Sequence, residues 1–577
     1  MSLMLTGVGL AKGVALGKAY VMQQGQAEIS EYDIPDYLLD EEVARFNQAI
    51  KQVREQLTSI REKIAESTPE EITEFVESHI LTLDESAISR APAKLIREKK
   101  INAEWALKQQ QDNLLKVFDD IDEPYLNTRK NDVDLVVAAI LKTLKQQDIE
   151  PLDILDEDNH LERIIIADKI APSDLALLNS ENLAGFVSEH DAPNSHTAIM
   201  ARSLGIPAIT GIGKARKYIK DGERLILDGK YGTICVNPDE VSSKHYKQLI
   251  QNIRQYKDEL NLLCSKPAVT MDGHKVTLSA NIEMMSELEK MQKCGAEAIG
   301  LFRTEYLYMN REQLPDEAEQ YQFYADLVRK AGDVAVNVRT LDIGADTQLP
   351  GVSEDSRHSN PMLGLRAIRF SLIHKNIFKQ QIKAILRAAA HGKVGVILPL
   401  IGSAYELDKA REIISNSKQE LGAADIEFGD IKLGMMIEIP AAALLIEYFA
   451  KRVDFIAIGT NDLTQYMLAI DRNDDQVSNL FDSTHPAILR VINNIIQTCN
   501  KLEKEVLVCG EMAGDNKFTR LLLGMGLRNF SMMPAQTLEI KKHIRSSSID
   551  NAKLFAGEIL KSTRPERIEE LIAKLNQ

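Results

Sequence analysis

The C-terminal half of the chain repeats one pattern eight times: a short apolar run followed by a longer segment with helical periodicity. The runs lie at residues 276–281, 297–302, 333–339, 393–399, 433–437, 454–458, 505–509 and 528–533. Apolar runs of this length that alternate with helices indicate parallel strands covered on both faces. Eight such units predict a closed (β/α)8 barrel over residues 266–577, and a doubly wound open sheet is the structural alternative.

Five of the runs end on, or a few residues before, a charged or reactive side chain. These residues are Arg303, Arg339, Glu438, Asp462 and Cys509. Functional groups at the carboxyl ends of successive strands are typical of a barrel active site, whereas an open sheet would collect its ligand groups near one switch point. The combination of arginines, two carboxylates and a thiol predicts an anionic substrate, a divalent metal and a proton donor.

The residue types set the chemistry at this edge. Glu438 and Asp462 form a sparse set of oxygen ligands, which suits Mg²⁺ because this ion keeps several waters and takes other ligands from its substrate. Arg303, Arg339 and Arg472 can each bind a phosphate or carboxylate through two N–H groups. Taken singly, each carboxylate or arginine also fits an ordinary salt bridge, and a lone buried cysteine also fits a small core residue.

The N-terminal half has two further patterns. Between residues 39 and 64, apolar residues recur at alternating spacings of four and three, and a helix start follows at Ser67-Thr68-Pro69-Glu70-Glu71. These features predict an all-helical segment over 34–147, whose charged faces fit either solvated surface or a docking face for a basic partner. Short β runs predict an α/β domain from residues 1–33 and 148–239, and 240–265 reads as a polar helical linker.

One segment of the α/β domain carries a candidate nucleophile. Ser195-His196-Thr197 stands at the start of an amphipathic helix, where free N–H groups and the helix dipole favour an anion. Imidazole can attack phosphorus at neutral pH, although a histidine at a helix start is more often a residue of the cap.

Composition excludes several classes of protein. At 577 residues the chain should contain two to four domains, and its net charge of −16 argues against a broad nucleic-acid or anionic-membrane surface. Its five cysteines lack paired spacing, which indicates a reduced, cytoplasmic protein. The N-terminus lacks a secretory pattern and no apolar run approaches ~20 residues, so we expect no membrane span.

Together these stretches closely resemble enzyme I of the phosphoenolpyruvate:sugar phosphotransferase system, over essentially the whole chain. The motifs that carry the resemblance occur in the family's order: Ser195-His196-Thr197-Ala198-Ile199-Met200-Ala201-Arg202, Gly300-Leu301-Phe302-Arg303-Thr304-Glu305, Arg339-Thr340-Leu341-Asp342-Ile343-Gly344, Asn360-Pro361-Met362-Leu363-Gly364, Gly459-Thr460-Asn461-Asp462-Leu463-Thr464-Gln465-Tyr466 and Cys509-Gly510-Glu511.

The resemblance implies a reaction and a set of roles. The phosphoryl group would pass from phosphoenolpyruvate to His196, at Nε2, and then to the phosphocarrier protein HPr docked on residues 34–147, with release of pyruvate. Cys509 would protonate the enolate, and the family is homodimeric through its barrel. The resemblance also implies that Glu438 and Asp462 hold Mg²⁺ and that phosphoenolpyruvate is bound by Arg303, Arg339, Asn461, Asp462 and Arg472.

The chain departs from the family at several positions. Asp191 and Ala192 replace two glycines before the histidine, Thr347 replaces a lysine, His358-Ser359 replaces an acidic pair, and Leu365 replaces an aromatic residue. These changes bear on rate and partner choice. Asp191-Ala192 and Thr347 motivate one alternative, a signalling or scaffold protein with weakened catalysis.

Another alternative shares the phosphohistidine domain and the barrel. Pyruvate phosphate dikinase and phosphoenolpyruvate synthase also need a large ATP-binding domain. The chain has no room for such a domain and no Gly-rich phosphate loop.

Overall fold

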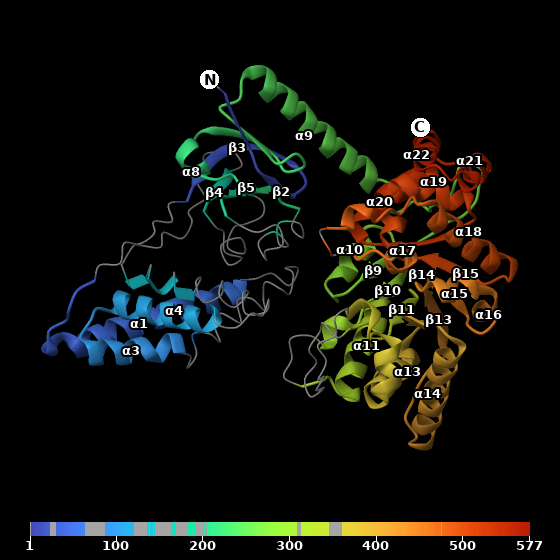
Figure 1. Cartoon of the computed structure of the whole chain (residues 1–577), viewed down its shortest axis with the longest axis horizontal. Helices are drawn as coiled ribbons and strands as arrows, with labels where there is room; N and C mark the ends of the chain where they lie inside the picture. Colours follow the sequence, from blue (N-terminus) through green and yellow to red (C-terminus); the bar gives the residue numbers. More distant parts are fainter. Residues whose placement is uncertain are drawn as a thin grey trace. The chain divides into compact units, whose positions relative to one another are not determined.

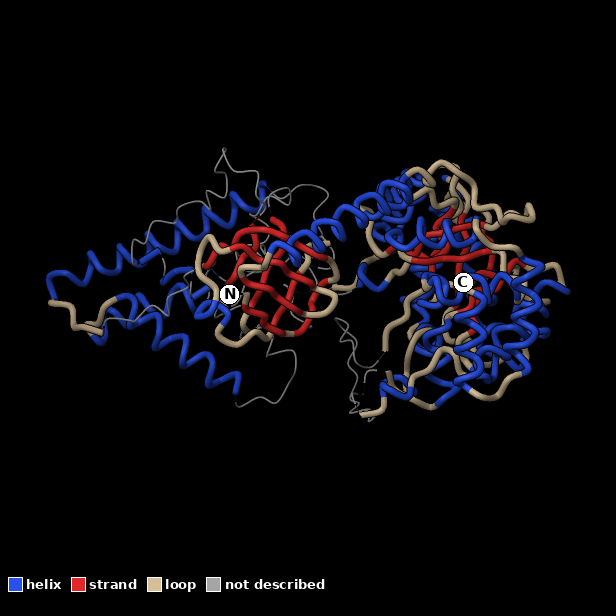
Figure 2. Tube along the Cα trace, turned by 90° about the horizontal axis from the view of Figure 1, so that it is seen from above, coloured by secondary structure: helices blue, strands red, loops and turns tan. Residues whose placement is uncertain are grey.

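The computed structural model describes residues 2–22, 31–63, 83, 87–119, 136–137, 139–141, 143–144, 163–168, 183–190, 198, 201, 205–308, 313–344, 361–472, 474 and 476–577. The chain divides into two compact units, Met1–Gln255 and Tyr256–Gln577. Figure 1 colours the chain by sequence and Figure 2 by secondary structure.

An eight-stranded sheet forms the core of the first unit. Its strands are β1 (Leu3–Thr6), β2 (Val8–Ala11), β3 (Val14–Val21), β4 (Arg163–Ala167), β5 (Leu183–Ser188), β6 (Ala208–Thr210), β7 (Arg224–Asp228) and β8 (Thr233–Val236). They follow the order β1-β8-β7-β3-β4-β5-β6-β2, and β3 pairs in parallel with β4 but antiparallel with β7. Apolar side chains form a separate cluster around Phe186 and another around Leu227. This mixed sheet agrees with the α/β class predicted from the short β runs.

A group of helices packs around a separate apolar core of this unit. They are η1 (Asp36–Leu38), α1 (Leu39–Lys63), α3 (Ala87–Lys99) and α4 (Ala103–Asp119). Phe46 and Val53, from the apolar stripe predicted on α1, are buried with Ile96 of α3 and Leu107 of α4. The helix start predicted at residues 67–71 lies outside the described residues.

A buried ion network joins α1 to α4. Arg45 lies 2.6 Å from Glu42 and 2.8 Å from Glu104, and it donates to the carbonyl oxygen of Leu144 at 2.9 Å. Glu42 also accepts a hydrogen bond from the backbone N–H of Ala103. Because both carboxylates are nearly buried, removal of Arg45 would leave two uncompensated negative charges between the helices.

The second unit is a closed barrel of eight parallel strands in sequence order, with the last strand paired to the first. The strands are β9 (Thr277–Ile282), β10 (Ala298–Phe302), β11 (Val336–Arg339), β12 (Val394–Leu398), β13 (Ile431–Ile437), β14 (Phe455–Ile458), β15 (Glu505–Val508) and β16 (Asn529–Met532). Each coincides with one of the eight apolar runs. The predicted (β/α)8 barrel is therefore confirmed, and the alternative of an open sheet is wrong.

Helices surround these strands, as Figure 2 shows in blue around red. They are α10 (Glu287–Lys293), α11 (Glu317–Ala331), α12 (Ile368–Ile373), α13 (Lys375–Ala388), α14 (Ala404–Ala423), α15 (Pro440–Leu444), α16 (Ile446–Ala450), α17 (Thr460–Leu468), α18 (Pro486–Lys501), α19 (Asn516–Gly524), α20 (Pro534–Arg545), α21 (Ile549–Lys561) and α22 (Pro565–Leu575). None of the described helices is both long and apolar enough to cross a bilayer.

Two apolar layers hold the barrel together. Successive side chains on a strand point to opposite faces, so Leu301 and Phe302 of β10 belong to different layers. Phe302 joins the large cluster between strands and helices. Leu301 joins a small interior cluster with Met436 and Phe455. Gly434 leaves room for the Phe455 ring, because a Cβ there would lie 2.3 Å from it. The interior is thus a packed core, which confines ligand binding to the ends of the strands.

The helix α9 (Glu240–Asn261) contains the boundary between the two units and has no buried residue. Side chains of α20 hold its last turn and the residues after it. Lys542 Nζ lies 4.0 Å from the ring centroid of Tyr256. The buried Lys541 donates to the carbonyl oxygen of Cys264 at 3.1 Å. The end of α9 is therefore fastened to the barrel unit.

The loop before the first barrel strand caps a helix close to the C-terminus. Asp272 accepts hydrogen bonds from the Thr270 hydroxyl at 2.6 Å and from the backbone N–H groups of Ile549 at 2.6 Å and Asp550 at 3.2 Å, in the first turn of α21. The Thr270 hydroxyl and these amides favour the charged carboxylate and hold the pKa of Asp272 well below its usual range.

We expect Asp272→Asn to lower the Tm at neutral pH. A carboxylate whose folded pKa is depressed stabilises the fold above its unfolded pKa of about 4, and that contribution is lost as the pH falls. The Tm difference between wild type and variant should therefore shrink between pH 7 and pH 3 in thermal melts. Asp333→Asn, at an exposed aspartate of the same unit, is the matched control. A difference that stayed constant over this range would contradict the capping role.

Candidate active site

The side chains predicted from the strand ends lie at one rim of the barrel. Because all eight strands are parallel, their carboxyl ends meet there. Arg303 follows β10, Arg339 ends β11, Glu438 follows β13 and Cys509 follows β15. Asp462 stands in the first turn of α17, directly after β14. Five strands thus bring arginines, carboxylates and a thiol to the same rim.

A continuous series of ion pairs crosses this rim. Its members alternate in charge, and we call them the charge chain: Glu305, Arg339, Asp342, Arg366, Asp462 and Arg472. Successive members are 3.0, 2.8, 2.9, 3.1 and 3.6 Å apart, measured between nitrogen and oxygen. The side chains of the four inner members are at most 13% exposed. Removing one partner from a buried pair of this kind costs about 3–5 kcal/mol, so each inner charge depends on its neighbours.

The charge chain contains three of the predicted residues, namely Arg339, Asp462 and Arg472. Arg303 instead pairs with Glu283, which follows the neighbouring strand β9. The positive charge of Arg303 still acts on Asp342 and Cys509, which places it beside the charge chain.

Sequence reasoning assigned no role to the other three members. Glu305 and Asp342 each stand three residues beyond a strand end, inside motifs that the family resemblance singled out, and that position was the available signal. Arg366 precedes α12 and reaches Asp342 across 24 positions of sequence. No local pattern marks it.

The two predicted metal ligands are buried carboxylates at this rim. Glu438 is 2% exposed and accepts a hydrogen bond from the backbone N–H of Leu400 at 2.6 Å. Burial, followed by the negative charges of Asp342 and Asp462, raises the pKa of Glu438 to about 8. Oδ1 of Asp462 is buried without a hydrogen-bond partner among the described residues, and Arg472 lies 3.6 Å from it. A divalent cation that prefers oxygen ligands fits this donor set.

The thiol at the rim is suited to hold a proton. Cys509 is 5% exposed, and its Sγ lies 3.6 Å from the carbonyl oxygen of Ile458. Burial, followed by the charge of Glu438, raises the pKa of Cys509 to about 12, against the opposing charges of Arg339 and Arg303. The group therefore stays a thiol at neutral pH, which fits a proton donor and not a thiolate nucleophile.

Side-chain bonds fix the loop that carries this thiol. Asn461 Nδ2 donates to Glu511 Oε1 at 2.9 Å, and Asn461 Oδ1 accepts from the backbone N–H of Glu511 at 3.0 Å. Asn281 of β9 donates to the carbonyl oxygen of Cys509 at 2.9 Å. The loop after β15 is thus tied to the start of α17, so Cys509 and Asp462 keep a fixed relation.

Several positions singled out in the sequence lie outside the described residues. They are His196, Asp191, Ala192, Thr347, His358 and Ser359. Leu365 is described, and it packs against the large barrel core as a partly buried side chain.

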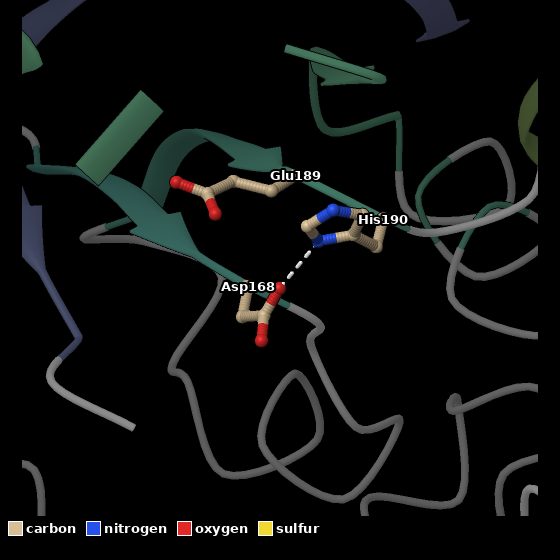
Figure 3. A group of neighbouring side chains, drawn as sticks. All are labelled: Asp168, Glu189 and His190. Carbon is tan, nitrogen blue, oxygen red and sulfur yellow. Dashed lines mark hydrogen bonds and ion pairs between the residues drawn. The ribbon is translucent and has the colours of Figure 1, made fainter. Parts of the chain in front are cut away.

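A second group of charged side chains lies in the α/β sheet of the first unit (Figure 3). Asp168 follows β4, and Glu189 and His190 follow β5, with His190 Nδ1 at 2.6 Å from Asp168 Oδ1. Their ligand atoms lie within 4.8 Å of one another. However, Arg216, from the short helix α8 (Ala215–Tyr218), reaches Glu189 at 3.2 Å and Asp168 at 3.4 Å. The guanidinium already pairs with both carboxylates, so we interpret the group as a salt-bridge network that joins two strand ends to α8.

Each of the two units matches known protein families. Three family profiles match the chain: "PEP-utilising enzyme, PEP-binding domain" over residues 257–549, "PEP-utilising enzyme, N-terminal" over 6–129 and "PEP-utilising enzyme, mobile domain" over 161–232. Together with the barrel and its charged rim, they define the class of the protein, an enzyme that utilises phosphoenolpyruvate.

Relatives within this class cover nearly the full length. The chain is 39% identical to a phosphoenolpyruvate-protein phosphotransferase of Cupriavidus necator, over 98% of each chain. Proteins of the same name from Haemophilus influenzae and Bacillus subtilis are 38% and 36% identical, over 99% and 98% of this chain and 98% of each relative. The chain belongs to the phosphoenolpyruvate-protein phosphotransferase family, and the resemblance to enzyme I is confirmed.

We expect Cys509 to resist alkylation in the native protein. Iodoacetamide reacts with the thiolate, and both the raised pKa of about 12 and the low exposure of this thiol oppose that reaction. Peptide mass spectrometry should show modification at least about 100-fold slower at pH 7.5 than in the urea-unfolded chain. Equal rates in the folded and unfolded states would contradict the protonated, buried thiol.

Proposed function

We propose that the chain is a phosphoenolpyruvate-protein phosphotransferase that transfers the phosphoryl group of phosphoenolpyruvate first to its own His196 and then to the histidine of an HPr-like phosphocarrier protein. Pyruvate is released, and the reaction is the first step of the sugar phosphotransferase system. The charge chain at the barrel mouth is the observation that carries this proposal, because it concentrates buried arginines beside the buried carboxylate of Glu438.

In this proposal phosphoenolpyruvate is bound through its phosphate and carboxylate. The contacts come from Arg303, Arg339, Asn461, Asp462 and Arg472. Arginine suits both groups because its planar fork of N–H donors matches two oxygens at once. A buried Nε of Arg339 has no hydrogen-bond partner among the described residues, which supports a contact with a ligand. Fixed positive charge of this kind stabilises the transferring phosphoryl group.

Glu438 and Asp462 hold Mg²⁺ in this proposal. When bound, Mg²⁺ would neutralise phosphate charge and orient the substrate. The raised pKa of Glu438 supports the assignment, because burial and the negative charges of Asp342 and Asp462 oppose ionisation of this carboxyl, and a bound cation would favour it.

Phosphoryl transfer replaces one bond of phosphorus with another. The bond between phosphorus and the enol oxygen breaks while a bond forms between phosphorus and Nε2 of His196. The enolate of pyruvate then takes a proton at its methylene carbon from Sγ of Cys509, and the thiolate regains a proton from solvent. Formation of the keto product makes the donor step strongly downhill.

The partners are assigned to different parts of the chain. Residues 34–147 dock the phosphocarrier, and the barrel forms the homodimer. Exposed leucines at positions 363, 444 and 480, at the ends of short helices that follow β11, β13 and β14, support an interface at the mouth end of the barrel. The protein acts in the cytoplasm in this proposal, without nucleic acid.

Labelling with phosphoenolpyruvate tests the reaction. We expect purified protein with Mg²⁺ and [³²P]phosphoenolpyruvate to acquire acid-labile, base-stable phosphate. The label should be lost in His196→Ala and should fall to background after EDTA treatment, with recovery when Mg²⁺ is restored. His190→Ala, at an exposed histidine in the same unit, is the matched control and should label normally. Absence of label in the wild type would favour the scaffold alternative.

Replacement of the proposed proton donor should slow the formation of pyruvate without preventing phosphorylation of His196. We expect Cys509→Ala to accept phosphate at His196 but to form pyruvate roughly 10²-fold more slowly or worse, because a positioned general acid contributes about that much. Coupled lactate dehydrogenase measures pyruvate while ³²P measures transfer. Unchanged pyruvate turnover would remove Cys509 from this role.

A further inference from the structure

One member of the charge chain touches two arginines at once. Oδ2 of Asp342 lies 2.8 Å from Nη1 of Arg339, and Oδ1 accepts from Nε of Arg366 at 2.9 Å. Nη2 of Arg366 also reaches Oδ2 of Asp342 at 3.4 Å. The Asp342 carboxylate therefore binds two nitrogens of Arg366, Nε and Nη2, and one nitrogen of Arg339, Nη1.

Asp342 is itself held in place. Its side chain is 1% exposed, and its backbone N–H donates to Oε1 of Glu305 at 2.9 Å. The same Glu305 oxygen lies 3.0 Å from Nη2 of Arg339. Both ends of the Arg339 guanidinium are thus fixed by carboxylates, while its Nε remains without a hydrogen-bond partner among the described residues.

The Asp342 carboxylate also determines which N–H group of Arg366 is left to contact Asp462. Nη2 of Arg366 lies 3.1 Å from Oδ2 of Asp462, a proposed metal ligand. With Nε held by Asp342, the plane of the Arg366 guanidinium is fixed, and Nη2 alone is shared with Asp462. Without Asp342, Arg366 would be free to turn both N–H groups onto Asp462.

We propose that Asp342 is a positioning residue of the phosphoryl-transfer site, which orients Arg339 toward the substrate and Arg366 toward Asp462 in one fixed arrangement. The inference rests on the proposed function and goes beyond it, because it assigns a role to a residue that contacts neither the phosphate donor nor the histidine. Electrostatic catalysis depends on such preorganised donors, and a displacement of about 1 Å costs roughly 10²-fold in rate.

A different role would be charge compensation alone, and the two roles predict different kinetics. Asp342→Asn offers one acceptor and one donor, so one of the two arginines would meet an N–H group where it now meets an oxygen. The variant also removes a negative charge near a trianionic substrate, which by itself strengthens binding. Asp342→Glu keeps the charge but moves the carboxylate by one methylene.

The experiment is autophosphorylation of the full chain in a single turnover, with [³²P]phosphoenolpyruvate and saturating Mg²⁺. The rate of label incorporation against substrate concentration gives the maximal rate and the half-saturating concentration. We expect Asp342→Asn to lower the maximal rate about 100-fold with a half-saturating concentration within about threefold of wild type. We expect Asp342→Glu to remain at least about 10-fold slow.

Controls separate this role from folding and from the proposed function. Asp326→Asn removes a carboxylate from an exposed ion pair with Arg329 on α11 and should behave as wild type. Thermal melts report whether each variant folds, and Asp342→Glu carries the test if Asp342→Asn does not.

Three outcomes overturn the positioning role. They are a maximal rate within about threefold of wild type in a folded Asp342→Asn, a defect confined to the half-saturating concentration, and a wild-type rate in Asp342→Glu. Absence of label in the wild type would instead overturn the proposed function and this inference with it.

Discussion

Charge compensation between buried guanidinium and carboxylate groups is the constraint on which the barrel mouth depends. A guanidinium stays charged in any surroundings, so each buried arginine needs a carboxylate within reach. The structure meets this need by sharing, since Asp342 serves two arginines and Arg366 serves two aspartates. The result is an ordered rim in which only selected atoms, such as Nε of Arg339 and Oδ1 of Asp462, remain without hydrogen-bond partners among the described residues.

Burial gives two neighbouring groups of this rim complementary properties. Glu438 and Cys509 both have raised pKa values, and in each case burial is the largest cause. For the Glu438 carboxyl, burial and nearby negative charges oppose ionisation, which a bound cation would favour, whereas for the Cys509 thiol the raised pKa keeps the proton in place at neutral pH. One packed environment therefore raises the pKa of both groups, which fits the proposed roles of Glu438 as a metal ligand and Cys509 as an acid.

The barrel could be predicted from sequence because its determinants are local. Eight apolar runs of strand length specify eight strands, and the residues that follow them, such as Arg303 and Glu438, must lie at the shared rim of a parallel sheet. The charge chain could not be predicted in the same way. Its inner contacts depend on how loops fold back, and Arg366 meets Asp342 and Asp462 only once the barrel has closed. The salt-bridge network of Asp168, Glu189 and Arg216 was missed for the same reason.

Closure of the barrel pairs strands that are far apart in the sequence and are therefore synthesised at different times. β9 pairs with β16, and Asp272 caps α21, across more than half of the unit. During synthesis the first strand therefore leaves the ribosome long before its neighbour exists. Until β16 emerges, β9 and β15 each present an unpaired edge, which is the kind of surface that chaperones cover and that aggregating chains share. Nascent chains stalled before residue 529 should accordingly be the most dependent on that protection.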